Sequence, residues 1–215
     1  MNIDRSSMLL YAVTDRSRLK NRSLTDAVEE AIKAGITFLQ LREKNLDYDS
    51  FLQLAKEIKK IADKYGIPYV INDNVDIAMA CGADGVHVGQ RDMEAKSVRK
   101  IIGPNKILGV SAQTVEQAIN AEKNGADYIG VGSVFPTSTK LDAEAVSYET
   151  LKDICNAVSI PIVAIGGINK DNVMKLAGSG IDGIAVVSAI FAQSDITAAV
   201  KELRQLSSMV VNYNP

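Results

Sequence analysis

Short apolar stretches alternate along the chain with longer segments in which apolar residues recur every three or four positions. The short stretches are rich in Val and Ile and mostly lack polar alternation, which is typical of parallel strands buried on both faces. We therefore expect eight strands, at Leu9–Thr14, Thr37–Leu41, Tyr69–Asn72, Gly85–Val88, Lys106–Val110, Tyr128–Val131, Ile162–Ile165 and Gly183–Val187.

The segments between these strands predict amphipathic helices. Thr114 followed by Gln117 has the spacing of a capping box and indicates that a helix begins there. In two other segments the apolar residues share one helical face. They are Leu24, Ala27, Val28, Ala31 and Ile32 in the first, and Phe51, Leu54, Ala55, Ile58 and Ile61 in the second.

A glycine followed by a small or apolar residue recurs at or just before predicted strands. A glycine just past a helix end supplies the left-handed backbone that a C-terminal cap requires, and an apolar run after it indicates a buried strand. The phrase therefore marks helix-to-strand junctions and favours one repeating βα domain over separate domains. It occurs as AGITF (34–38), YGIPY (65–69), CGADG (81–85), NGADY (124–128) and SGIDG (179–183).

Eight strands with intervening helices predict a compact (β/α)8 barrel of the α/β class, a single domain over residues 1–215 with about 27 residues per unit. The alternative is an open doubly wound sheet, which usually carries G-x-G-x-x-G after its first strand. Here the first predicted strand ends in Thr14-Asp15-Arg16, so the barrel is favoured.

Composition and charge narrow the class of function. Hydrophobic residues make up 47% of the chain and charged residues 23%, which is a globular balance. Lys and Arg number 24 against 26 Asp and Glu, so the basic excess of a duplex-binding surface is missing and we expect no nucleic-acid partner.

The apolar run Met8–Val13 is too short for a secretion signal, and no run approaches the ~18 residues of a membrane span. We expect a cytoplasmic protein without a membrane partner, with Cys81 and Cys155 as buried reduced thiols.

The carboxyl ends of the strands are where a barrel gathers its active site. The second strand runs into Gln40-Leu41-Arg42-Glu43-Lys44, and alternation places Gln40, Arg42 and Lys44 on one side. Arg offers a planar fork to a phosphate and Lys a mobile charge. Taken alone, such a run is more often a solvated surface turn.

Asp73 and Asp92 follow two neighbouring strands and can both face the barrel mouth. Mg²⁺ is typically held by one or two carboxylates with water and substrate phosphates, so the pair predicts a magnesium site. The alternative is helix capping, because both residues precede predicted helices.

The turns after the last two strands predict a phosphate site. Gly166-Gly167 and Ser188 lie there, and Ile168-Asn169-Lys170 indicates that a helix begins directly afterwards. Barrels often hold a phosphate on backbone N–H groups at this place, although Gly-Gly can also be a tight turn alone. The only histidine, His87, and Tyr11 of the first strand are expected to be packing residues.

In order along the barrel the chain carries YAVTDR (11–16), QLREK (40–44), INDNVDIA (71–78), GADGVHVGQ-x-D (82–92), GVSAQT (109–114), GVGSVFPTSTK-x-D (130–142), AIGGI (164–168) and VVS (186–188). Together these motifs resemble the thiamine-phosphate synthase (thiamine-phosphate pyrophosphorylase) family. QLREK with the P-T-S-T-K loop is highly specific, whereas AIGGI is common to many phosphate-binding barrels.

The resemblance implies an enzyme that joins a hydroxymethylpyrimidine diphosphate to a thiazole phosphate and releases pyrophosphate. A carboxylated thiazole phosphate would lose CO₂ as well. Small phosphorylated molecules would be its partners and one Mg²⁺ its cofactor, held by Asp73 and Asp92. The family pattern assigns the pyrimidine diphosphate to Gln40, Leu41, Arg42, Glu43, Lys44, Asn72, Ser111 and Lys140, with Lys140, Ser111 and Arg42 as the catalytic groups. It assigns the thiazole phosphate to Thr137, Ser138, Thr139, Gly167, Val187 and Ser188.

The residue types agree with this chemistry. Pyrophosphate leaves from a carbon on an electron-rich aminopyrimidine, and preorganised cations and metal stabilise the charge that develops on it. The thiazole nitrogen is already a nucleophile, so a site with one histidine suffices. A thiazole tautomerase on the same barrel would not need Arg42, Lys44 or Lys140. A non-catalytic binding protein of the thiamine pathway is the alternative from another class.

Overall fold

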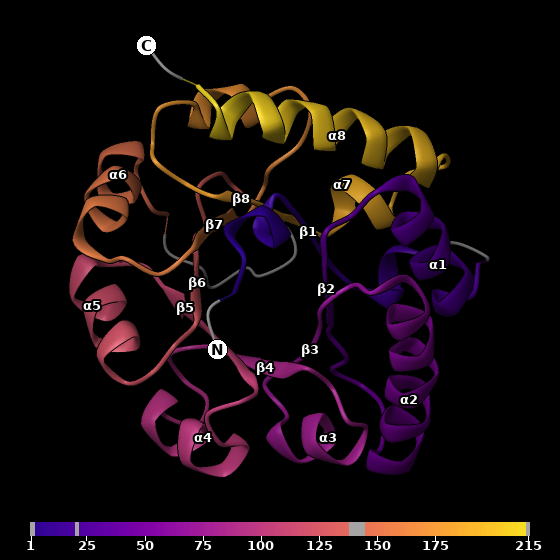
Figure 1. Cartoon of the computed structure of the whole chain (residues 1–215). Coiled ribbons are helices and arrows are strands. Elements are labelled where there is room, and N and C mark those ends of the chain that lie inside the picture. The colour runs from indigo at the N-terminus through magenta and orange to yellow at the C-terminus, as the bar shows by residue number, and fades with distance from the viewer. Residues whose placement is uncertain (1–2, 20–21, 138–144, 214–215) are drawn as a thin grey trace.

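The computed structural model describes residues 3–19, 22–137 and 145–213 and forms a closed barrel of eight parallel strands in chain order, as predicted. Figure 1 looks along the barrel, with the strands in a central ring and the helices around it. The first strand closes the ring against the last, with Tyr11 opposite Ala185. The strands are β1 (Leu10–Val13), β2 (Phe38–Leu41), β3 (Tyr69–Asn72), β4 (Gly85–Val88), β5 (Ile107–Ala112), β6 (Tyr128–Val131), β7 (Ile162–Ile165) and β8 (Gly183–Val186), each within two residues of its predicted bounds.

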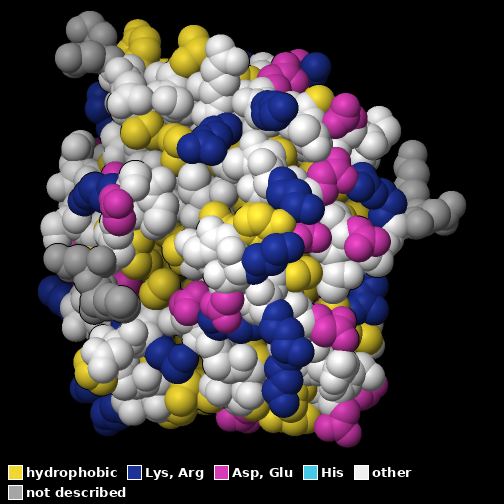
Figure 2. Space-filling model, turned by 45° about the vertical axis from the view of Figure 1, so that its right-hand side comes forward, with side chains coloured by type: hydrophobic (Ala, Val, Ile, Leu, Met, Phe, Trp, Pro, Cys, Tyr) yellow, Lys and Arg dark blue, Asp and Glu magenta, His cyan; other side chains and the backbone are white. Residues whose placement is uncertain are grey.

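Helices follow most strands and cover the outside of the barrel. Lys, Arg, Asp and Glu are mixed over the face seen in Figure 2, in keeping with the even charge count. None of the helices in the described part of the chain is long and apolar enough to cross a membrane. The α-helices are α1 (Leu24–Ala34), α2 (Tyr48–Tyr65), α3 (Val75–Ala80), α4 (Ala95–Ile102), α5 (Val115–Lys123), α6 (Tyr148–Ala157), α7 (Ser188–Phe191) and α8 (Ile196–Val211), and the 3-10 helices are η1 (Arg5–Met8), η2 (Arg16–Arg18) and η3 (Val173–Leu176).

The prediction that a helix begins at residues 168–170 is wrong. The segment between β7 and β8 contains the 3-10 helix η3 and turns. Asn169 Oδ1 accepts from the N–H of Asp171, and Asn172 Oδ1 accepts from the N–H of Asn169, both at 2.9 Å. Such local side-chain bonds offer the backbone an alternative to helical hydrogen bonding, and here they hold the chain in turns.

All five glycines of the recurring phrase have a left-handed backbone, as predicted. Gly35 and Gly66 cap α1 and α2, with φ of 118° and 66°. Gly82 and Gly125 directly follow the last residues of the α3 and α5 caps, whereas Gly180 follows a turn. Thr114 caps α5 as predicted, since its Oγ1 accepts from the N–H of Gln117 at 3.2 Å. The predicted apolar stripe of α1 is entirely buried. In α2, Phe51, Ala55 and Ile58 are buried, while Leu54 and Ile61 are partly buried against the core.

Four of the five glycine phrases also contain a polar residue that joins two neighbouring strands at their amino ends. The residue just before each even-numbered strand accepts a hydrogen bond, through its side chain, from a backbone N–H at the start of the preceding strand. The acceptors are Thr37 for Leu10 (2.8 Å), Asp84 for Tyr69 (2.9 Å), Asp127 for Leu108 (2.8 Å) and Asp182 for Ile162 (2.8 Å). We call these four contacts the strand-start clamps; they join the strands in consecutive pairs.

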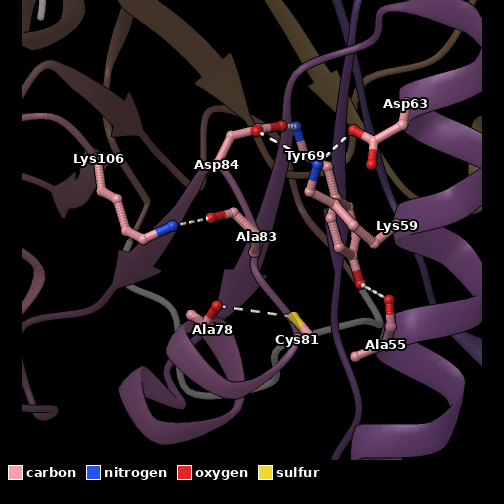
Figure 3. A network of polar contacts seen from close by, with 9 residues as sticks. All are labelled: Ala55, Lys59, Asp63, Tyr69, Ala78, Cys81, Ala83, Asp84 and Lys106. Atoms are coloured by element: carbon pink, nitrogen blue, oxygen red, sulfur yellow. Dashed lines mark hydrogen bonds and ion pairs between the residues drawn. The ribbon is translucent and has the colours of Figure 1, made fainter.

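Each clamp aspartate also faces a cation. Arg99 reaches Asp127 and Arg5 reaches Asp182, both at 2.6 Å, and Lys59 lies 3.5 Å from Asp84. Figure 3 shows Asp84 between the Tyr69 backbone and Lys59. Because all four clamps lie where the strands begin, they are at the end of the barrel opposite its carboxyl rim. This end usually serves stability.

Two apolar layers result from the alternation of strand side chains. The inner layer fills the barrel, and its buried members are Met8, Tyr11, Val13, Phe38, Val70, Ile107, Tyr128, Val163 and Ala185. The outer layer lies between the sheet and the helices and includes Leu39, Leu41 and Ile71. Both cysteines are free thiols, as expected. Cys81 is buried as predicted, but Cys155 is only half-buried, so the prediction of burial is wrong for it.

Candidate active site

A cavity of about 990 Å³ opens at the carboxyl ends of the strands, and all eight strands or the loops after them contribute to its wall. Its size matches the range of small-molecule sites. Eleven of the predicted site residues line it: Gln40, Arg42, Lys44, Asn72, Asp73, Asp92, Ser111, Thr137, Gly167, Val187 and Ser188.

The other five predicted site residues are not among the described residues that line the cavity. Leu41 is fully buried in the outer layer, and Glu43 pairs with Arg16 at 3.3 Å, so neither is among the described residues that line the cavity. Strand alternation explains both positions, because neighbours of Gln40 and Arg42 point to the other face. Ser138, Thr139 and Lys140 lie outside the described residues.

Arg42 is positioned from the first strand. The hydroxyl of Thr14, which is fully buried, accepts a hydrogen bond from the Arg42 N–H at 2.9 Å, and the Thr14 N–H donates to the carbonyl of Gln40 at 3.0 Å. Thr14 thus holds β2 in line as it leaves the barrel. The sequence pattern marks Thr14 only as the end of a strand and does not indicate this role.

An acidic pair with a lysine occupies one side of the cavity. Lys44 Nζ lies 2.6 Å from Asp73 Oδ2, and Asp92 Oδ2 accepts from the N–H of Gly89 at 2.7 Å. Burial opposes the charge on Asp73, but the hydrogen bonds from Lys44 and Asp92 outweigh it and hold the pKa below its usual value. Burial raises the pKa of Asp92, and its contact with Asp73 raises it further.

Helix capping does not account for these aspartates. The cap of α3 is Asn74, whose Oδ1 accepts from the Ile77 N–H at 2.9 Å. The cap of α4 is Glu94, whose side chain makes no capping hydrogen bond. The capping alternative is therefore wrong. Asp73 also has a left-handed φ of 61°, a conformation that non-glycine residues adopt uncommonly and often at functional sites.

The Gly166-Gly167 turn forms the opposite side of the cavity. Both glycines have left-handed backbones, with φ of 101° and 66°. A Cβ on Gly167 would collide with the carbonyl oxygen of Pro136 and come within 2.8 Å of that of Phe135. Only glycine fits, because the loop after β6 lies directly against this turn.

The floor of the cavity contains the two residues expected to serve packing. His87 is buried and hydrogen-bonded on both ring nitrogens, and Tyr11 belongs to the inner layer, so both packing predictions are confirmed. Both also line the cavity, a position that single-residue reasoning missed.

Comparison with known proteins decides the family. The model of the family described as thiamine monophosphate synthase matches residues 10–190. The chain belongs to this family. The resemblance inferred from the motifs is thereby confirmed, and the chain is a transferase of thiamine biosynthesis, a thiamine-phosphate synthase by family.

Relatives in this family are close over nearly the whole chain. The thiamine-phosphate synthase of Clostridium tetani is 59% identical over 194 residues, 90% of this chain and 93% of that protein. The one from Ruminiclostridium cellulolyticum is 57% identical, over 92% and 94%. Among solved structures, a thiamine phosphate pyrophosphorylase from Pyrococcus furiosus is 40% identical, with a TM-score of 0.89 over 97% of this chain and 99% of that one. A 3-hexulose-6-phosphate synthase, 18% identical with a TM-score of 0.65, shares the fold alone.

Proposed function

We propose that the cavity joins the diphosphate of a hydroxymethyl-aminopyrimidine to a thiazole phosphate, giving thiamine phosphate and pyrophosphate. The observation that carries this is the division of the cavity into two polar sides. Arg42 and Lys44 lie with the acidic pair on one side, and the Gly166-Gly167 turn lies on the other. Two anionic substrates can therefore enter one cavity of about 990 Å³ without competing for the same groups.

The diphosphate is assigned to the side formed by β2 and β3. Arg42 provides a bidentate fork and Lys44 a point charge, and Asn72 adds an amide at the end of β3. Gln40 and Ser111 lie on the cavity wall where the pyrimidine ring would follow. The family pattern adds Lys140 to this group.

Asp73 and Asp92 fit a single Mg²⁺. Both line the cavity, and partial burial together with the nearby carboxyl of Asp73 raises the pKa of Asp92. A divalent cation bound between the two carboxylates would offset this unfavourable charge. In the described part of the chain no group of three or more His, Cys, Asp and Glu could hold a metal. Two carboxylate ligands would leave the other coordination positions of Mg²⁺ to water and diphosphate oxygens, which is the ligand set that Mg²⁺ prefers. When bound, the ion would neutralise charge on the diphosphate.

The thiazole phosphate is assigned to the opposite side. Gly167, Val187 and Ser188 line the cavity there, where their backbone N–H groups would be the phosphate donors, and Thr137 adds a hydroxyl. Phosphate bound by loops after the seventh and eighth strands is a frequent use of this fold. Ser138 and Thr139 join this group from the family pattern.

The chemistry requires charge stabilisation more than proton transfer. The bond from the pyrimidine methylene carbon to the diphosphate oxygen breaks with both electrons on oxygen, and the electron-rich ring supports the cation that remains. Arg42 and Lys44 stabilise the departing oxygens, since fixed cations act most strongly where charge develops. The thiazole nitrogen then forms the new C–N bond with its own lone pair, so no base is needed. We propose a cytoplasmic enzyme acting on these small phosphates.

The test is pyrophosphate release by the purified chain with both substrates, compared with each substrate alone. Release that requires both, with formation of thiamine phosphate, is expected. Arg42→Ala should lower kcat/KM for the pyrimidine diphosphate at least a hundredfold, while Lys96→Ala, exposed on α4, should have no effect. Binding without turnover would indicate the non-catalytic alternative, and proton exchange without pyrophosphate release would indicate a tautomerase.

A further inference from the structure

Five side chains from five strands form one chain of hydrogen bonds beneath the cavity, which we call the floor relay. Gln40 Nε2 donates to the Tyr11 hydroxyl at 2.6 Å, and the hydroxyls of Tyr11 and Tyr128 are 2.7 Å apart. Tyr128 reaches His87 Nδ1 at 2.9 Å, and His87 Nε2 reaches Ser111 Oγ at 3.0 Å. The relay thus connects two groups, Gln40 and Ser111, that both face the cavity.

The barrel is built around this relay. Tyr11 and Tyr128 are at most 1% exposed, and Gln40 and His87 are 5% and 8% exposed. A Cβ on Gly109 would collide with the Tyr128 ring and lie 2.5 Å from His87 Nδ1, so β5 has a glycine where the relay crosses it. In such surroundings a hydroxyl hydrogen without an acceptor is costly.

The orientation of the Gln40 amide, with its nitrogen toward the Tyr11 hydroxyl, gives the relay one direction, because every later member then needs an acceptor for its own hydrogen. Tyr11 already accepts from Gln40, so its own hydrogen goes to Tyr128. Tyr128 then donates to Nδ1 of His87, which leaves the ring hydrogen of His87 on Nε2. That hydrogen goes to Ser111, whose own hydrogen is left to point into the cavity. Burial raises the pKa of both tyrosines far above 10, which keeps both hydroxyl hydrogens in place.

We propose that the floor relay selects the heterocycle, with Tyr128 as the positioning residue. Because Gln40 turns its amide nitrogen toward Tyr11, its carbonyl oxygen is left on the other side of the amide as an acceptor for the cavity, while Ser111 is compelled to donate. The cavity then favours a ring that presents an amino group to β2 and a lone pair to β5. It disfavours the 4-oxo ring, which carries an acceptor where the amino ring carries a donor. The identity of the ring rests on the proposed function; the direction of the relay does not.

A substitution at Tyr128 interrupts the relay with the least change to the cavity. It is fully buried and is not among the described residues that line the cavity, so Tyr128→Phe removes only the hydroxyl between Tyr11 and His87. Tyr69→Phe is the matched control. Tyr69 is also a fully buried strand tyrosine, but its hydroxyl bonds to the Ala55 carbonyl at 3.2 Å on the outer side of the barrel.

The direction is tested by nitrogen NMR of untagged protein labelled with ¹⁵N-histidine, in which His87 gives the only imidazole signals. We expect hydrogen on Nε2 and an acceptor at Nδ1 in the parent and in Tyr69→Phe, and a loss of this single tautomer in Tyr128→Phe. A parent with hydrogen on Nδ1, or a tautomer unchanged in Tyr128→Phe, would overturn the relay. The measurement on the parent decides the direction even if Tyr128→Phe does not fold.

The selection is tested by the ratio of kcat/KM for the amino and the 4-oxo pyrimidine diphosphates. We expect Tyr128→Phe to lower this ratio at least tenfold, the effect of about one hydrogen bond, and Tyr69→Phe to leave it unchanged. An unchanged ratio in Tyr128→Phe would overturn the selection, because a purely structural hydroxyl affects stability and not the ratio. If the parent turns over neither diphosphate, the proposed function fails, and the tautomer measurement still decides the relay.

Discussion

Removal of the Asp127 carboxylate should destabilise the barrel without touching its active site. Asp127 Oδ2 accepts from the Leu108 N–H at 2.8 Å and from Arg99 at 2.6 Å, and its side chain is 10% exposed. In Asp127→Ala the buried N–H of Leu108 loses its acceptor, which costs about 1–3 kcal/mol. Arg99 keeps its bonds to the carbonyls of Gly103, Lys106 and Gly125 and is not left bare.

The loss of the Arg99 contact adds about 1 kcal/mol, because that pair is mostly shielded from solvent. We therefore expect Asp127→Ala to lower the free energy of unfolding by about 3 kcal/mol, and the Tm by roughly 6–12 °C for a chain of this size. Asp127→Asn keeps an oxygen for the Leu108 N–H and should lose only about 1 kcal/mol.

The assay is urea unfolding followed by circular dichroism, with Asp153→Ala on the exposed face of α6 as the matched control. The slope of unfolding free energy against urea should stay constant, and kcat/KM of the folded protein should be unchanged. If Asp127→Ala lost less than about 1 kcal/mol, or no more than Asp153→Ala, the clamp would not contribute as argued.

Three further predictions concern the site and the surface. Asp73→Asn and Asp92→Asn should each raise the Mg²⁺ concentration needed for half-maximal pyrophosphate release, and near-parental activity of both at low micromolar Mg²⁺ would refute the metal assignment. Lys140→Ala should slow single-turnover pyrophosphate release by roughly 10²–10³-fold; a rate within about threefold of the parent would exclude its role. The hydrogen bond from Lys64 leads those that hold the pKa of Glu29 at about 2. Above the pKa that Glu29 has in the unfolded chain, the parent should therefore be more stable than Glu29→Gln. This difference in stability should disappear as the pH falls toward 2, and acid titration of both proteins will show it.

The sequence predicted the barrel because its signal is local and repeated. Apolar strands and the glycine phrase are visible without knowing what packs against them, and the structure places every strand within two residues of expectation. The helix after β7 was wrong because the turn-forming bonds of Asn169 and Asn172 depend on side-chain geometry that apolar periodicity does not report.

Site prediction succeeded where alternation along one strand was enough. Gln40, Arg42 and Lys44 do share the cavity, whereas Leu41 and Glu43, included with the whole run, point to the other face. The floor relay was not foreseen. Its members come from strands that are separated by up to 117 residues, as for Tyr11 and Tyr128, and no spacing rule connects them.

The strand-start clamps group the eight strands of the closed barrel into four consecutive pairs. Each clamp lies within one pair of consecutive strands, β1 with β2, β3 with β4, β5 with β6 and β7 with β8. A chain cut between α4 and β5 would leave two halves that each keep both of their clamps. A cut between β5 and β6 would instead separate Asp127 from the Leu108 N–H that it holds. We therefore expect the tolerance of this barrel to new chain ends to depend on whether they spare the clamps of its amino-terminal face, at the far end from the chemistry.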